Sequence, residues 1–184
     1  MTECLPRSFF DRPTLEVAPQ LLGQVLVRRL AGEVYESEIV EVEAYTSDDP
    51  ACHAYGGRKK RCEVMFGPAG YAYVYFIYGM YHCLNVVTEG DGVPGAVLIR
   101  AVSPLSGLEH TRTNGPGKLC KTLAIDLALN GQPLFARGEL YIAAAKPDLK
   151  PLRVIATPRI GISKAQERLW RFCWQDHPAL SRRS

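Results

Sequence analysis

The segment Val40–Tyr45 carries the residues best placed for acid–base chemistry. Successive side chains of a β-strand point to opposite faces, so Glu41, Glu43 and Tyr45 share one face of a strand predicted here. Charged residues are common on a solvated strand face, and we expect Glu41 to lie on one. Glu43 differs, because an aromatic residue follows it on the same face where the strand ends. A carboxylate beside an aromatic ring at a strand end suits a general base at the edge of a cleft.

A second group of chemistry-bearing residues is the tyrosine-rich segment Tyr71–Tyr81. Tyr71, Tyr73 and Tyr75 alternate along a predicted strand and share one face. Tyrosine is ordinary in a half-buried strand, but a row of flat rings is also a surface on which nucleic-acid bases stack. The residues Tyr78 to Tyr81 are predicted to lie at a hairpin tip, where exposed apolar side chains are able to insert between base pairs.

Basic residues gather in the run Arg58–Arg61, directly after Gly56 and Gly57. Taken alone, such a run is better explained as a solvated loop, although the glycines would let backbone amides approach a phosphate closely. Gly115–Lys118 opens a predicted helix, whose first amides are a second candidate phosphate site. The spacing of a Walker A loop is absent there.

Asn85 and Arg100 are polar residues within strands predicted to be central. A buried polar group is costly unless it is paired, so each residue needs a partner. An internal structural hydrogen bond is the commoner explanation for a lone Asn or Arg. The alternative is that both residues line a pocket together with a carboxylate and the aromatic row.

Hydrophobic periodicity and turn residues indicate the elements that position these side chains. Asp11 is predicted to cap the first helix and Gly23 to end it. The strands follow one another in hairpins, which favours an α+β fold with a largely antiparallel sheet. The predicted helices are 13–22 and 117–127, the predicted strands are 24–30, 33–45, 71–78, 81–88, 95–102, 140–144, 152–158 and 169–174, and 47–61 is a predicted loop.

Length and composition indicate one ordinary globular domain over residues 1–184. Apolar residues make up 47% of the chain and charged residues 22%, and the net charge is only +3. Six cysteines occur without a C-x-x-C pair and without an apolar leader, which favours reduced thiols in the cytoplasm. No apolar stretch is long enough to cross a membrane, and the four histidines lack zinc spacing, so we expect no metal.

Several motifs, taken together in order and spacing, are far more specific than any one of them. In combination the sequence resembles the alkyladenine (3-methyladenine, or methylpurine) DNA glycosylase family, from about residue 21 to residue 174. Cys62 stands where members of that family often have Asn. The stretches that carry the resemblance are 40–45 (VEVEAY), 53–58 (HAYGGR), 73–85 (YVYFIYGMYHCLN), 97–101 (VLIRA) and 115–124 (GPGKLCKTLA).

The resemblance implies a role for each matching residue. Glu43 is implied to be the general base, Arg100 to help hold the attacking water, and Tyr78 to be a wedge that fills the gap left by a flipped base. The residues implied to form the base pocket are Tyr45, His53, Tyr75, Asn85 and Leu98, with Asn85 rejecting guanine. The residues implied to face DNA are Arg58, Met80, Tyr81 and Lys118.

The resemblance also implies a fold and a function. The fold is a single α+β domain, similar to the C-terminal domain of formyltransferases, with a curved antiparallel sheet, surrounding helices, a protruding hairpin and peripheral chain ends. The function is excision of damaged purines from double-stranded DNA by a monofunctional, cofactor-free monomer, associated with the nucleoid in a bacterial cytoplasm. Two alternatives remain open: a non-catalytic nucleic-acid-binding module, and an RNA-directed enzyme on the same scaffold.

Overall fold

The computed structural model describes residues 3–105, 108–109, 112–148 and 152–183. Its strands form one eight-stranded sheet in the order β3-β4-β5-β2-β1-β6, with β8 added to β2 and β7 to β8. The pairings between strands are antiparallel, so the predicted α+β fold is confirmed. The strands are β1 (Val25–Leu30), β2 (Glu33–Thr46), β3 (Ala72–Ile77), β4 (Tyr81–Thr88), β5 (Gly95–Pro104), β6 (Leu140–Ala143), β7 (Val154–Thr157) and β8 (Arg171–Trp174).

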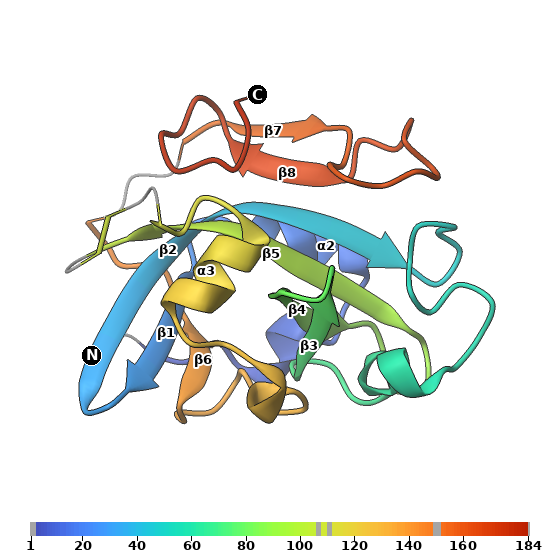
Figure 1. Cartoon of the computed structure of the whole chain (residues 1–184), viewed down its shortest axis with the longest axis horizontal. Helices are drawn as coiled ribbons and strands as arrows, with labels where there is room; N and C mark the ends of the chain where they lie inside the picture. The colour runs from blue at the N-terminus through green and yellow to red at the C-terminus, as the bar shows by residue number, and fades with distance from the viewer. Residues whose placement is uncertain (1–2, 106–107, 110–111, 149–151, 184) are drawn as a thin grey trace.

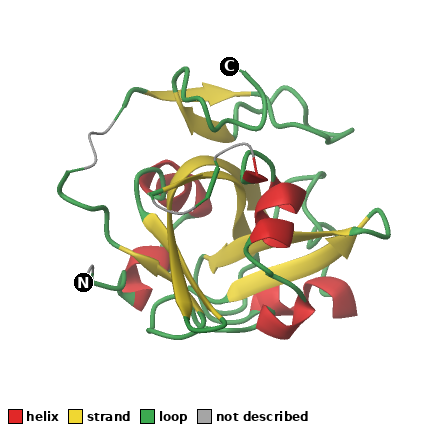
Figure 2. Ribbon diagram, turned by 60° about the vertical axis from the view of Figure 1, so that its left-hand side comes forward, coloured by secondary structure: helices red, strands yellow, loops and turns green. Residues whose placement is uncertain are grey.

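The helical segments are short and lie around the curled sheet (Figures 1 and 2). The 3-10 segment η1 and the helix α1 were not predicted, and neither has a side-chain cap that the sequence could reveal. The predicted helix 117–127 ends earlier, because Leu123 leaves helical geometry and Ala124 has a positive φ of 47°. The segments are α1 (Arg7–Phe10), α2 (Thr14–Gln20), η1 (Lys60–Phe66), α3 (Pro116–Thr122) and η3 (Leu127–Leu129).

Strand β2 organises the sheet because it is long enough to pair with three neighbours. Its first half pairs with β1 and its second half with β8 along the same edge, while β5 occupies the other edge. The eight residues 37–44 are all buried, so both faces of this strand are covered. Figure 1 shows β7 and β8 as a two-stranded ribbon beside the second half of β2.

The hydrophobic core takes in residues from both ends of the chain. Phe10 and Ala179 are fully buried in it, although we expected the terminal segments to be peripheral. The start of α2 is held by Glu89, whose carboxylate accepts from the Thr14 backbone N–H at 2.7 Å, so the predicted Asp11 cap is wrong. Gly23 follows α2 with a φ of +83°, as predicted for the residue that ends this helix.

The β3–β4 hairpin ends in a tight turn, and the side chains at this turn are exposed. Tyr78 and Gly79 have φ values of 55° and 67°, the pattern of a type I′ turn, and the Met80 N–H donates to the Ile77 carbonyl. The Tyr78 side chain is 76% exposed and Met80 is 65% exposed. Tyr81, the first residue of β4 after the turn, packs closely against Gly117 at the start of α3.

The cysteine side chains lie mostly in the interior of the protein. All six cysteines are free thiols, and five of them are buried. Among the described helices, none has the length and apolar character needed to cross a membrane. Within the same residues, no three His, Cys, Asp or Glu side chains gather in a way that could hold a metal ion.

Candidate active site

A cavity of about 610 Å³ opens beside the β3–β4 hairpin. Segments that are distant in sequence surround it: the end of β2 and the loop after it, the hairpin, β5, the start of α3, and residues 160–164. The cavity brings together most of the predicted site. Its lining includes the predicted residues Tyr45, His53, Tyr75, Tyr78, Tyr81, Asn85, Leu98, Arg100 and Lys118.

Glu43 lies directly behind the wall of this cavity and is completely buried. Its Oε2 accepts a hydrogen bond from the Tyr45 hydroxyl at 2.8 Å, and its Oε1 accepts one from the Ile160 backbone N–H at 2.7 Å. The Arg100 Nη1 atom lies 3.4 Å from Oε1. These three contacting residues all line the cavity, and the charged partner and the donors offset the cost of burying the carboxylate.

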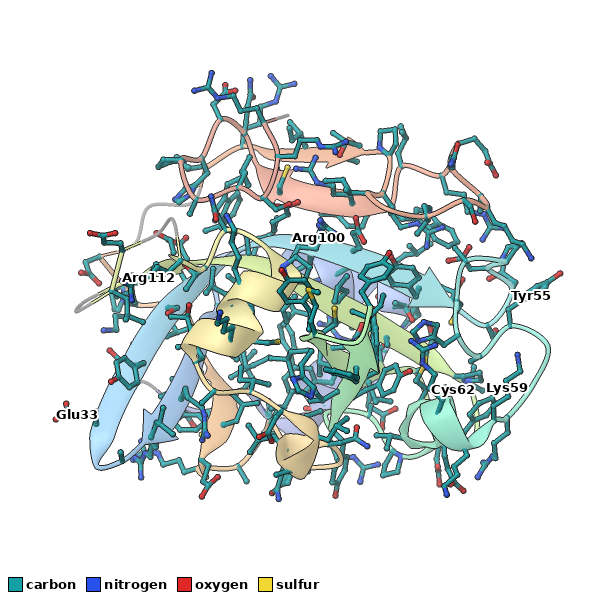
Figure 3. The ribbon with its side chains drawn as sticks, viewed as in Figure 1. Glu33, Tyr55, Lys59, Cys62, Arg100 and Arg112 are labelled. Carbon is teal, nitrogen blue, oxygen red and sulfur yellow. The ribbon has the colours of Figure 1, made fainter. Side chains whose placement is uncertain are left out.

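Arg100 reaches Glu43 from an irregular point in the β2–β5 pairing. The register shifts on either side of Glu41, a β-bulge of the kind that re-aims a side chain. The Arg100 Nε atom donates to Glu41 Oε1 at 3.2 Å, so one guanidinium joins both glutamates. Figure 3 shows Arg100 near the middle of the molecule, at the junction of β2, β5 and α3.

The prediction that Glu41 lies on a solvated surface is wrong, because β8 and the chain after it cover this face. Glu41 is completely buried. Its Oε1 accepts from Arg171 Nε on β8 at 2.7 Å, in addition to Arg100. Two arginines therefore accompany two buried glutamates, and the four charges balance.

Aromatic rings form one wall of the cavity. The His53 Nδ1 atom and the Tyr73 hydroxyl are 2.8 Å apart, and the His53 ring meets the Tyr75 ring edge-on with centroids 4.6 Å apart. Tyr75 is the cross-strand partner of Cys83, and both residues line the cavity. Tyr71 is not part of this wall, because its ring packs edge-on against Phe135. The predicted row of three tyrosines thus contributes two to the cavity.

Burial fixes the protonation states of these rings. It lowers the pKa of His53 to about 4, with the positive charges of Arg61 and Lys59 adding to the effect. Burial also raises the pKa of Tyr45 and of Tyr75 above the ordinary value. At neutral pH the wall is therefore an uncharged imidazole with uncharged phenols.

Asn85 and Leu98 are directly paired neighbours on β4 and β5 and both line the cavity. Asn85 is buried, and its side-chain Nδ2 donates to the backbone carbonyl of Tyr73 at 3.0 Å. The structural hydrogen bond and the pocket position, which the sequence left as alternatives, therefore occur together.

The basic residues predicted to face DNA, Arg58 and Lys118, are exposed. The predicted run 58–61 is exposed and leads into η1, and Figure 3 shows Lys59 at the edge of the molecule far from Arg100. Arg58 lies over the Phe66 ring at 5.0 Å. The Lys118 amine donates to Asn114 Oδ1 at 2.9 Å. Lys118 and Lys164 both line the cavity.

Contacts of the Cys62 thiol join the two ends of the loop before η1. The Cys62 Sγ atom donates to the carbonyls of His53 and Lys59, each at 3.5 Å. Cys62 thus links the residue that forms the aromatic wall to the start of η1.

The sequence did not reveal one buried ion pair next to the site. Arg159 and Asp49 are fully buried together, and Arg159 Nη1 also donates to the Ala44 carbonyl at 2.9 Å. The Arg159 guanidinium lies between the rings of Tyr45 and Trp170, 4.7 and 5.2 Å from their centroids. The partners are separated by 110 residues. Neither periodicity nor motif spacing signals such a pair.

Fold and site together define a class: a small α+β protein with a curled antiparallel sheet, an aromatic-walled cavity and a buried carboxylate–guanidinium pair behind it. Residues 8–178 match the family model described as Methylpurine-DNA glycosylase (MPG), and the chain belongs to that family. The resemblance noted in the sequence is confirmed.

Relatives of similar length share nearly the whole chain. A protein of Methanocella arvoryzae is 50% identical over 196 residues, covering 98% of this chain and 96% of the relative. Proteins of Trichodesmium erythraeum and Legionella pneumophila (strain Corby) are 46% and 48% identical, covering 98% and 97% of this chain and 98% of each relative. All three carry the name "Putative 3-methyladenine DNA glycosylase".

Proposed function

We propose that this protein is a DNA repair glycosylase that flips alkylated purines, such as 3-methyladenine and 7-methylguanine, out of duplex DNA and hydrolyses their N-glycosidic bonds. Family membership supports the reaction class. The observation that carries the proposal is the buried pair of Glu43 and Arg100, 3.4 Å apart, directly behind a cavity walled by aromatic rings.

Chemistry on a base within a duplex requires its extrusion, which costs a few kcal/mol and costs least for a weakly paired lesion. Tyr78 protrudes at the hairpin tip beside the cavity, where it would fill the gap left in the base stack. The extruded base would stack on Tyr45, His53 and Tyr75. N3- and N7-alkylated purines are cationic, so neutral aromatic walls attract them more strongly than normal bases.

In the proposed reaction, Glu43 and Arg100 position a water molecule below C1′ of the flipped nucleotide. The bond between C1′ and the purine nitrogen breaks, and its electron pair leaves with the purine, which the alkyl group makes a good leaving group. The water oxygen bonds to C1′ of the oxocarbenium-like sugar, and Glu43 accepts the water proton. The products are a free purine and an abasic site. This mechanism requires no metal or cofactor.

All residues of the proposed site come from one chain, so a monomer is sufficient for the reaction. With DNA as its substrate, the protein would act at the nucleoid in a bacterial cytoplasm. Etheno and deaminated purines are further candidate substrates, but they are neutral, so their release would also need an acid or a hydrogen-bond donor at the leaving nitrogen.

The test is release of free base from duplexes that each carry one lesion, with DNA and RNA backbones compared. We expect wild-type protein to release alkylated purines from DNA. Glu43→Gln should still bind lesion DNA but should lose base release by two or more orders of magnitude, roughly the contribution of a general base. Near-wild-type turnover of this variant would exclude Glu43 as the base. A non-catalytic binding module predicts no base release by either protein.

Monofunctional chemistry is tested on the same substrates. Borohydride traps the imine that a lysine forms with an abasic site, and the lysines at the cavity are Lys118 and Lys164. We expect no trapped protein–DNA adduct, because in the proposed mechanism water rather than an amine attacks C1′.

A further inference from the structure

The chain after β8 returns to the buried charges of the site through Ser181. The Ser181 hydroxyl donates to Glu41 Oε1 at 2.7 Å, and the Ser181 backbone N–H donates to Glu41 Oε2 at 2.6 Å. The same hydroxyl oxygen accepts from Arg100 Nη2 at 3.3 Å. One residue near the end of the chain thus contacts both members of the Glu41–Arg100 pair.

These contacts account for every nitrogen of the Arg100 guanidinium. Nε is held by Glu41, Nη2 by Ser181, and Nη1 lies against Glu43. The contact with Glu43 is the longest of the three, at 3.4 Å. The orientation of Nη1 toward the cavity therefore depends on the two anchors on the far side of the guanidinium.

Charge balance explains why those anchors matter. Glu41 and Glu43 both attract Arg100, and a guanidinium readily forms a bidentate pair with a single carboxylate. Arg171 and Ser181 occupy Glu41 with three donors, namely Arg171 Nε, the Ser181 hydroxyl and the Ser181 N–H. Glu41 is thereby satisfied without a second Arg100 nitrogen, and Nη1 is left for Glu43.

We infer that Ser181 is a positioning residue of the proposed glycosylase reaction: together with Glu41 it sets the direction of the Arg100 guanidinium that holds the attacking water with Glu43. This inference rests on the proposed function. It gives the segment after β8 a catalytic role in addition to its packing in the core.

The variant Ser181→Ala tests the inference, since it removes the hydroxyl and keeps the backbone N–H. We expect its single-turnover release of 7-methylguanine to fall about threefold to tenfold, the effect of one lost hydrogen bond on the barrier. The dissociation constant for lesion DNA should stay within about twofold of wild type. Ser181→Thr retains the hydroxyl and should restore the rate. Ser8→Ala, which removes an exposed hydroxyl on α1, is the matched control.

A spectroscopic measurement separates positioning from general destabilisation. The NMR signal of the Arg100 Nε–H group should move in Ser181→Ala and return in Ser181→Thr. An unchanged rate and an unchanged Arg100 signal in Ser181→Ala would overturn the inference, as would a rate loss that Ser181→Thr does not reverse. If wild-type protein releases no purine, the proposed function fails, and the Arg100 signal still decides whether Ser181 orients the guanidinium.

Discussion

Asn85 shows, at the scale of a single residue, how one side chain serves both the scaffold and the pocket. It donates to the Tyr73 carbonyl and also lines the cavity beside Leu98. Guanine differs from adenine and hypoxanthine by an N2 amino group on the minor-groove edge, and a side chain that occupies this space would exclude guanine.

We therefore predict that Asn85→Ala or Asn85→Ser raises excision of normal and N-alkylated guanine above the wild-type rate and keeps excision of adenine-derived lesions. The lost hydrogen bond to Tyr73 should also lower the free energy of unfolding by about 1–3 kcal/mol. Thermal melting and guanine release are measured on the same variant. A destabilised variant with unchanged rejection of guanine would restrict Asn85 to the structural role.

The lowered pKa of His53 predicts that the stability of the folded protein depends on pH. Burial lowers its pKa to about 4 in the folded protein, whereas an unfolded chain has a histidine pKa near 6.5. Between these values the unfolded chain binds more protons, so stability should fall as the pH drops from about 6.5 to 4. Between pH 7 and pH 5, the melting temperature of His53→Gln should fall less than the melting temperature of the wild-type protein. His82→Gln, on the β4 side of the hairpin, is the control and should keep the wild-type slope.

At the scale of elements, the β3–β4 hairpin joins the proposed wedge to the wall of the pocket. Tyr78 is at its tip and Tyr75 is in its first strand. Gly117 at the start of α3 lies against Tyr81 of the hairpin, and a Cβ atom at this position would lie 2.9 Å from the Tyr81 ring. The absence of a side chain there lets the hairpin pack closely on the helix whose first residues line the cavity.

We predict that Tyr78→Ala leaves stability unchanged, because the side chain is 76% exposed. Base release should fall, and it should fall further for a lesion in a fully paired duplex than for the same lesion in a mismatch, where extrusion costs less. The ratio of the two single-turnover rates is the measurement. Val93→Ala, which removes another exposed apolar side chain, should not change this ratio. Equal losses on both duplexes would argue against a wedge.

The elements were largely predictable from sequence, whereas the partners of buried charges were not. Alternation and turn residues predict β1, β2, β4 and β5 to within a few residues, because those signals are local. The burial of Glu41 depends on Arg171, 130 residues away, so no local pattern indicates it. Among the site residues, Glu43 stood out only because Tyr45 follows it, and the roles of the others came from resemblance rather than from spacing.

At the scale of the whole molecule, exposed basic residues come from two segments that are distant in sequence, although the net charge is only +3. Arg58 and Lys118 come from separate segments, the loop that leads to η1 and the start of α3. Both are exposed, and Lys118 lines the cavity. A duplex that presents a base to the cavity would bring its phosphates to these residues.

We predict that affinity for undamaged duplex falls steeply with salt, and that Arg58→Ala and Lys118→Ala each flatten the slope of log affinity against log salt by about one unit. Binding measured between 50 and 200 mM salt, roughly the range over which phosphate contacts dominate, provides the slopes. Arg112→Ala removes a charge on the opposite side of the molecule from Lys59 and should keep the wild-type slope (Figure 3). Unchanged slopes for Arg58→Ala and Lys118→Ala would exclude phosphate contacts by these residues.

The pairing of β8 with β2 has a consequence for the synthesis of the protein. The ribosome adds about 5–20 residues each second. The synthesis of Glu41 is therefore separated by several seconds from the synthesis of its partners Arg171 and Ser181. The residues of the β3–β4 hairpin and Lys118 are synthesised well before that moment, whereas Glu41 does not yet have Arg171 as a partner. A chain that stopped before β8 would therefore leave Glu41 without Arg171 and Ser181, and the proposed pair of Glu43 and Arg100 would lack its far-side anchors.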